Sequence, residues 1–206
     1  YYIDEDLAKT EKGTLTVNGV SSADSVISGV RNGTGDEKGS FFELTDSEST
    51  KLTIQNVTIQ DASRTTQTVK DGSILYMDSA NAKAELDNVV LKDSSVTGRG
   101  GAIAVLNGEL SITDSIFEGN SAGGVSNDIY IAGGNTVKFT TSENISSKIS
   151  SGLSGDGAFE KLGVGTLNLS GVNKDYTGNL TISQGIVDYV QSAGGSFIGG
   201  SVSMAN

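Results

Sequence analysis

The chain has 206 residues, of which 14 are basic and 25 acidic; its net charge is -11, and it contains no cysteine, histidine or proline. Without thiols or imidazoles it can form no disulfide, no Cys or His metal site and no Ser-His-Asp or Cys-His catalytic group. The negative charge repels nucleic acid and anionic lipid, and no apolar run reaches the roughly 20 residues that span a bilayer, so we expect neither nucleic-acid binding nor membrane insertion of this segment.

The N-terminal residues, YYIDEDLAKT, lack the basic start and the apolar core of a signal peptide, so we expect either an intracellular protein or a piece of a longer one. Residues 13–30 alternate between apolar and polar and are predicted to form a first, shorter coil, and residues 31–39 a loop. The acidic segments at residues 4–7 and around Asp36 lack calcium-ligand spacing. We expect them to be solvated loops, with no bound metal.

Three consecutive stretches of the chain then follow one pattern. They begin at Gly39, Gly72 and Gly101, and each has a glycine, a short apolar strand, a polar turn and a second strand. Equivalent places in the second strand and just beyond it hold Ile54, Leu86 and Ile112, then Asn56, Asn88 and Asp114, then Ile59, Leu91 and Phe117. We therefore predict a repeat with stacked aliphatic side chains inside and Asn or Asp at the corners.

The apolar residues of each stretch recur at every second position. Segments such as KLTIQNVTI (residues 51–59) are rich in Thr, Val, Ile and Leu and are bounded by turn residues, which is typical of short strands. A β-sandwich also has short strands, but it gives no reason for one residue type to recur at the same place in successive units. We predict a single all-β domain over residues 1–206, folded as a parallel β-helix (β-solenoid) of about eight coils and roughly 40 Å long.

The glycine pair Gly100–Gly101 could also belong to a phosphate-binding loop. However, no Lys-Ser or Lys-Thr follows it, and no helical pattern follows that could direct its N-terminus at a phosphate. We therefore expect a tight corner that needs a positive φ.

The later part of the chain is less uniform. Residues 141–157, TSENISSKISSGLSGDG, are irregular, and we expect them to bulge from the rod. Dense alternation returns in the segment that begins at Glu160. Since Gly and Ser occur throughout as turn residues, no linker is predicted.

Two segments resemble repeats of known families. The first resembles the paired GGA[ILV] and FxxN motifs of the polymorphic outer membrane protein repeat, through Gly100, Gly101, Ala102 and Ile103 followed by Phe117, Glu118, Gly119 and Asn120. The second, residues 162–187, resembles the autotransporter-associated β-strand repeat, through Gly163, Gly165, Thr166, Leu167, Leu169, Gly171, Asn173, Tyr176, Thr177, Gly178, Ile182 and Gly185. It departs from that pattern by one residue, because Lys174 and Asp175 both stand between the Asn and the Tyr.

Both families are passengers of type V secretion, in which a C-terminal barrel carries a right-handed parallel β-helix to the cell surface. The resemblance therefore implies an extracellular or surface-exposed, adhesin-like passenger, exported through the outer membrane. Its expected partners are a host receptor, a glycan or an identical passenger. The resemblance implies no catalytic residue, cofactor or metal, and it does not identify the binding residues.

Two other functions stay open. Parallel β-helices that resemble pectate lyases and polygalacturonases cleave polysaccharides with carboxylates, calcium and a basic residue, for which the candidates are Asp87, Asp93, Asp114 and Arg99. These aspartates mostly obey the repeat, whereas functional residues are expected to break it. A passive stalk is the other alternative.

Surface composition favours binding along the side of the rod. The outward strand positions carry Ser, Thr, Asn and Asp, which suit wide, wet and individually weak contacts. The tyrosines, which could line a sugar-binding face, are scattered along the sequence. We expect most of them to be packing residues with a solvated hydroxyl.

Overall fold

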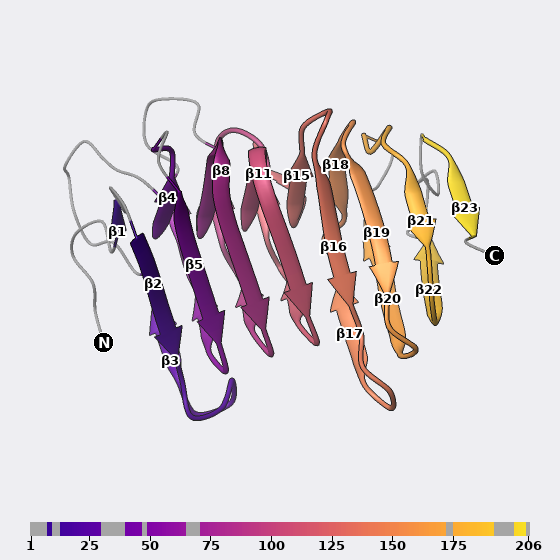
Figure 1. Cartoon of the computed structure of the whole chain (residues 1–206), viewed down its shortest axis with the longest axis horizontal. Coiled ribbons are helices and arrows are strands. Elements are labelled where there is room, and N and C mark those ends of the chain that lie inside the picture. The colour runs from indigo at the N-terminus through magenta and orange to yellow at the C-terminus, as the bar shows by residue number, and fades with distance from the viewer. Residues whose placement is uncertain are drawn as a thin grey trace.

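The computed structural model describes residues 8–9, 13–29, 40–46, 49–64, 71–171, 175–191 and 200–204, which form strands and turns and no helix. Successive coils of the chain lie side by side from the N-terminal to the C-terminal end (Figure 1). Each coil contributes strands to as many as four stacks, which we name a to d in the order in which the chain meets them. In the described ranges no helix is long and apolar enough to cross a membrane.

Stacks a and b form one large sheet. Stack a contains β1 (Ala8–Lys9), β4 (Phe42–Leu44), the first parts of β8 (Leu75–Asp87) and β11 (Ile103–Thr113), β15 (Ile129–Ile131) and β18 (Leu153–Gly155). Stack b contains β2 (Gly13–Asn18), β5 (Thr50–Gln55), the later parts of β8 and β11, β16 (Thr136–Thr140), β19 (Ala158–Leu162), β21 (Leu180–Ile182) and β23 (Val202–Met204).

Stacks c and d form two smaller sheets. Stack c contains β3 (Val26–Ser28), β6 (Thr58–Gln60), β9 (Val90–Lys92), β12 (Ile116–Glu118), β17 (Ser146–Ile149), β20 (Thr166–Gly171) and β22 (Ile186–Gln191). Stack d contains β7 (Ser63–Arg64), β10 (Ser95–Val96), β13 (Ser121–Ala122) and β14 (Val125–Ser126). The predicted all-β parallel solenoid is confirmed, because the described strands pair in parallel throughout, except for β13 with β14.

The predicted interior ladders are present in the register that the repeat indicates. Leu86 pairs with Ile54 on one side and with Ile112 on the other, and all three side chains are buried. In stack c, Leu91 lies between Ile59 and Phe117 in the same way. Stacking like on like buries these side chains in one continuous core, and this burial is the main source of stability in such a rod.

The Asn and Asp residues of the repeat form the corner between stacks b and c. Asn56, Asn88 and Asp114 have φ angles of 55°, 50° and 47°, a conformation that Asn and Asp adopt more readily than other residues with a side chain. The amides also join the coils: Asn88 Nδ2 donates to Asn56 Oδ1 at 2.9 Å, and Asn56 Nδ2 donates to Asn18 Oδ1 at 3.2 Å. The predicted corner ladder is confirmed.

The third unit of the repeat begins one residue earlier than the sequence comparison indicated. Leu75 pairs with Ile103, which places Gly100 rather than Gly101 next to Gly72. Gly72 and Gly100 share a positive φ, 57° and 65°, so the predicted tight corner lies at Gly100. In this register Gly101 is the neighbour of Ser73, so the sequence comparison had matched Gly72 with the second glycine of the pair.

The expectation that residues 141–157 bulge from the rod is wrong for most of that stretch. It contains β17 and β18, which continue stacks c and a by pairing with β12 and β15. The irregular pattern arises because short Ser-rich strands bury few large side chains. Only Ile149 and Leu153 are buried hydrophobic residues in this stretch.

The segment that resembles the autotransporter-associated repeat completes about one coil, from the corner at Gly163 to the corner at Gly185. Tyr176 is buried and donates its hydroxyl to the carbonyl of Asn179 at 2.9 Å. A Cβ at Gly178 would overlap the main-chain oxygen of Gly157 in the coil below. Asn173 and Lys174 lie outside the described residues, as do the acidic segments at residues 4–7 and 34–39 and the loop predicted at residues 31–39.

The side chain of Lys161 enters the apolar core. Lys161 takes the ladder position between Phe139 and Ile182, and its exposed fraction is 0%. Its Nζ donates to the carbonyls of Leu162 at 2.6 Å and Gly163 at 2.7 Å. Burial lowers the pKa of Lys161. The carbonyls of the corner therefore replace the water that the ammonium loses.

Candidate functional site

A β-hairpin interrupts the repeat in stack d. β13 and β14 are antiparallel and are joined by Gly123 and Gly124, whose φ angles are 57° and 78°. Two consecutive residues with positive φ characterise the tight hairpin turns for which Gly-Gly is a preferred sequence. The chain therefore doubles back on itself here before it enters β15.

The hairpin and stack a enclose a cleft of about 370 Å³ on the side of the rod. We call it the hairpin cleft, and its lining residues are Gly98, Arg99, Ala122, Val125, Ser126, Asn127, Tyr130, Ser154, Gly155 and Asp175. These residues come from successive coils, so only the folded rod brings them together. Val125, on the hairpin, is 53% exposed.

Arg99 is held in place by Asp71. Its Nε and Nη2 donate to Asp71 Oδ2 at 3.1 and 2.7 Å, and its main-chain N–H donates to Asp71 Oδ1 at 2.7 Å. The Asp71 hydrogen bonds raise the pKa of Arg99, so its guanidinium stays charged. Asp71 balances that charge and leaves the guanidinium little freedom to move.

Arg99 in turn fixes Tyr130. Its Nη1 donates to Tyr130 Oη at 2.7 Å, and its Cζ lies 4.3 Å from the centre of the Tyr130 ring. Tyr130 points outward from β15, where its register partners on either side are the small residues Ala104 and Ser154. The ring is thus oriented by a cation and is not crowded by its neighbours in the stack.

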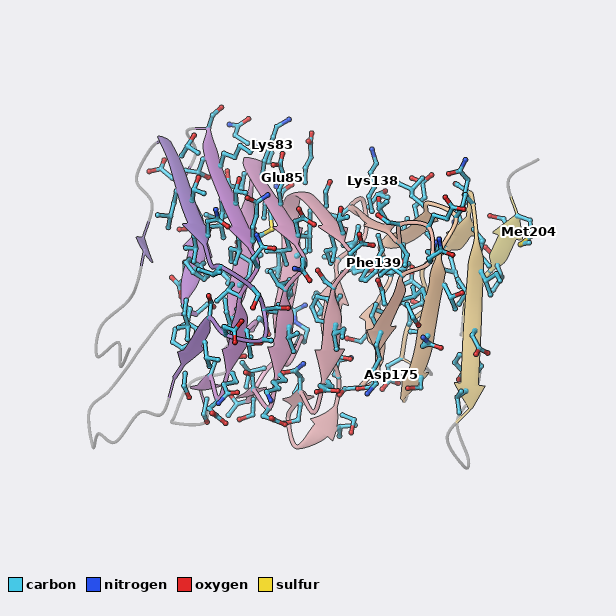
Figure 2. All side chains as sticks on the ribbon, turned by 90° about the horizontal axis from the view of Figure 1, so that it is seen from below. Lys83, Glu85, Lys138, Phe139, Asp175 and Met204 are labelled. Carbon is cyan, nitrogen blue, oxygen red and sulfur yellow. The ribbon has the colours of Figure 1, made fainter. Side chains whose placement is uncertain are left out.

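Polar side chains complete the cleft. Ser154 Oγ donates to Asn127 Oδ1 at 3.2 Å. Within the described part of the chain, Asn127 Nδ2 has no hydrogen-bond partner, so this donor is available to a ligand. Asp175 is exposed, and Figure 2 shows it toward the side of the rod opposite Lys83.

The buried carboxylate of Asp128 holds the base of the hairpin that forms one wall of the cleft. Asp128 is fully buried and accepts hydrogen bonds from Asn120 Nδ2 at 2.7 Å and from the main-chain N–H of Ser151 at 2.6 Å. Because Asn120 precedes the hairpin and Asp128 follows it, this contact closes the base of the hairpin. Burial raises the pKa of Asp128 to about 6, although these hydrogen bonds act in the opposite direction.

The residues at the defining positions of the GGA[ILV] and FxxN motifs build this corner and are buried, whereas Glu118 and Gly119 between them reach the surface. Gly101, Ala102, Ile103 and Phe117 are buried. Asn120 is also buried, and besides Asp128 its Nδ2 contacts the carbonyl of Leu91 at 3.0 Å. The motif is therefore structural in this chain, and the cleft lies above it.

The four residues considered for polysaccharide cleavage lie at three different corners. Asp87 and Asp114 lie at the corner between stacks b and c, Asp93 follows stack c, and Arg99 lies between stacks d and a. Asp93 has a φ of 52° and so plays the same corner role as Asp61. Among the described residues, no group of three or more acidic side chains is arranged to hold a metal ion.

Two of the described tyrosines, Tyr76 and Tyr130, lie close together in the fold. Tyr76 and Tyr130 lie on the outer face of stack a, with Ala104 between them in register. Tyr176 and Tyr189 pack against the core as expected, but the hydroxyl of Tyr176 bonds to the carbonyl of Asn179 and is not solvated. The cleft was not predicted from the sequence; its signal there is the Gly123–Gly124 pair, which is typical of a tight hairpin.

The outer face of stack b is a weaker candidate. Figure 2 shows Lys83, Glu85 and Lys138 projecting from this side of the rod. Two ion pairs on this face join neighbouring coils, with Lys51 Nζ 2.8 Å from Glu85 Oε1 and Lys83 Nζ 2.9 Å from Glu109 Oε2. A second depression, between residues 143–146 and 164–166, contains no aromatic residue.

Comparison of the chain with protein-family models, curated proteins and solved structures gave no match.

Proposed function

We propose that this chain is part of an exported, surface-displayed passenger and acts as an adhesin-like rod that binds ligands on its side. The observation that carries the proposal is the hairpin cleft. There the repeat is broken, and an arginine, a tyrosine and several polar groups from successive coils gather at the surface. In a solenoid, residues that obey the repeat build the rod, so those that depart from it are available for binding.

The surface location rests on the resemblance of residues 100–120 and 162–187 to passenger repeats. A binding role also accords with the dispersal of the four candidate catalytic residues over three corners. The cleft is small and open to solvent, so we expect single-site dissociation constants of roughly micromolar or weaker. Adhesion would then depend on many copies acting together.

The test compares single and multiple display of the full chain. Beads that carry many copies should attach to cultured mammalian epithelial cells, whereas the monomer should bind them only weakly. The variant Val125→Glu places a charge on the exposed wall of the cleft and should reduce attachment at least about tenfold. Lys83→Ala, on the outer face of stack b, is the matched control and should attach normally.

Other results would contradict the proposal. Equal attachment by wild-type and Val125→Glu beads would remove the cleft from the binding site. Beads that clump with one another but ignore the cells would indicate self-association instead. Catalytic release of sugars from acidic polysaccharides with calcium present would indicate an enzyme.

A further inference from the structure

We propose that the hairpin cleft binds a neutral, hydroxyl-rich sugar, with Tyr130 as the surface on which the sugar ring stacks. This inference rests on the proposed binding function and names the ligand class for the same site. It is argued from the platform, the polar groups around it and the local charge.

The platform is the oriented ring of Tyr130. Arg99 fixes the ring through the hydrogen bond to Oη and through the guanidinium that lies 4.3 Å from the ring centre. A rigid aromatic side chain offers contact area at low cost in conformational entropy. Since Ala104 and Ser154 flank it in the stack, a ligand ring can approach without displacing a large neighbour.

The polar groups around the platform suit hydroxyl groups, which both donate and accept hydrogen bonds. Asn127 Nδ2 is a free donor among the described residues, and the Asp175 carboxylate is an acceptor at the cleft wall. Ser126 and Ser154 add hydroxyls. A few convergent polar groups beside an apolar surface are typical of a small-molecule site.

Local charge argues against an acidic ligand. Among the described residues, the basic side chain that lines the cleft is Arg99, which is already paired with Asp71, while Asp175 adds a negative charge at the wall. The whole chain carries a net charge of -11, which repels sialylated or sulfated glycans. A cationic ligand would meet the guanidinium that already lies against the ring of Tyr130.

The experiment measures binding of the full chain to matched sugars by saturation-transfer NMR. The neutral probes are oligomers of N-acetylglucosamine, oligomers of mannose and galactose-terminated oligosaccharides; the acidic probes are sialylated and sulfated forms of the last. We expect at least one neutral probe to bind and its charged counterparts to bind more weakly. Tyr130→Ala should reduce binding at least about tenfold, while Tyr130→Phe, which keeps the ring, should retain most of it.

Tyr76→Ala is the matched control. Tyr76 lies on the same outer face, on the other side of Ala104, but does not line the cleft, so its loss should leave binding unchanged. Val125→Glu provides a second test that does not depend on how well Tyr130→Ala folds. If the acidic probes bind more tightly than the neutral ones, and Val125→Glu abolishes that binding, the proposed ligand class is wrong but the proposed function stands. Absence of binding by every neutral probe would overturn the inference, and normal bead attachment by Val125→Glu would overturn both.

Discussion

Asp128 gives the fold a pH dependence whose sign follows from its surroundings. The carboxyl group is fully buried beneath the hairpin, and burial raises its pKa to about 6 from an ordinary value of 3.8. Asn120 and Ser151 donate hydrogen bonds to it, which compensate only part of the lost hydration. The folded chain therefore holds a proton on Asp128 at pH values where the unfolded chain has released it.

Because the folded-state pKa is the higher one, the contribution of Asp128 to stability is full below about pH 4 and is lost as the pH rises through about 6. Each unit of pKa difference corresponds to about 1.4 kcal/mol, so the rise from 3.8 to about 6 amounts to about 3 kcal/mol. Well above pH 6, Asp128 is ionised in both the folded and the unfolded chain, so its effect on the free energy of unfolding no longer changes with pH.

Urea unfolding at pH values from 4 to 7 measures this effect when wild-type chain is compared with Asp128→Asn. The asparagine does not titrate, so the difference between the two free energies of unfolding should change by up to about 3 kcal/mol across this range. Asp156→Asn, at an exposed turn, is the control and should follow the wild-type curve. A difference between wild type and Asp128→Asn that stays constant from pH 4 to 7 would refute the assignment.

Three further predictions concern the rod itself. Leu86→Asp puts an unpaired carboxylate into the interior ladder and should lower the free energy of unfolding by about 3 kcal/mol or more, whereas Glu85→Ala on the outer face should cost about 0.5 kcal/mol or less. Equal melting temperatures for the two variants would contradict the register. Gly178→Ala forces a Cβ into the backbone of the coil below and should lower the free energy of unfolding by about 3 kcal/mol or more. Gly134→Ala, at a site with open space but a φ of 84°, should lower it by about 1 kcal/mol. Similar losses for the two variants would mean that the coils are not in close contact at Gly178. EDTA should not change the melting temperature, and a drop restored by calcium would revive the interpretation as a calcium-dependent lyase.

The sequence was sufficient to predict the ladders because a solenoid repeats its interactions. Ile54, Leu86 and Ile112 recur at equivalent places in successive coils, and the same packing constraint selects each of them. The corner residues Asn56, Asn88 and Asp114 were predictable for the same reason, since these three coils share a positive φ at that point. In a repeat, contacts between distant residues can therefore be recognised from residue types that recur along the sequence.

The cleft could not be predicted in this way because it depends on departures from the repeat. Arg99 and Tyr130 are 31 residues apart, and nothing in the spacing of either shows that they touch. Their contact depends on the hairpin, and its signal, Gly123–Gly124, resembles the many other turn glycines of the chain. The buried pair of Asn120 and Asp128 was equally hidden, because in the sequence Asp128 resembles any surface aspartate.

Mapping a bound ligand onto the backbone tests the central claim, that the side of the rod binds at the hairpin cleft. In an assigned ¹⁵N spectrum of the full chain, titration with the neutral oligosaccharide that binds best should shift the amide signals of Arg99, Val125 and Tyr130, which line the cleft. Signals from the outer face of stack b, such as that of Lys83, should not move. Shifts confined to stack b would contradict this claim, and a spectrum that no neutral oligosaccharide changes would overturn the proposed ligand class.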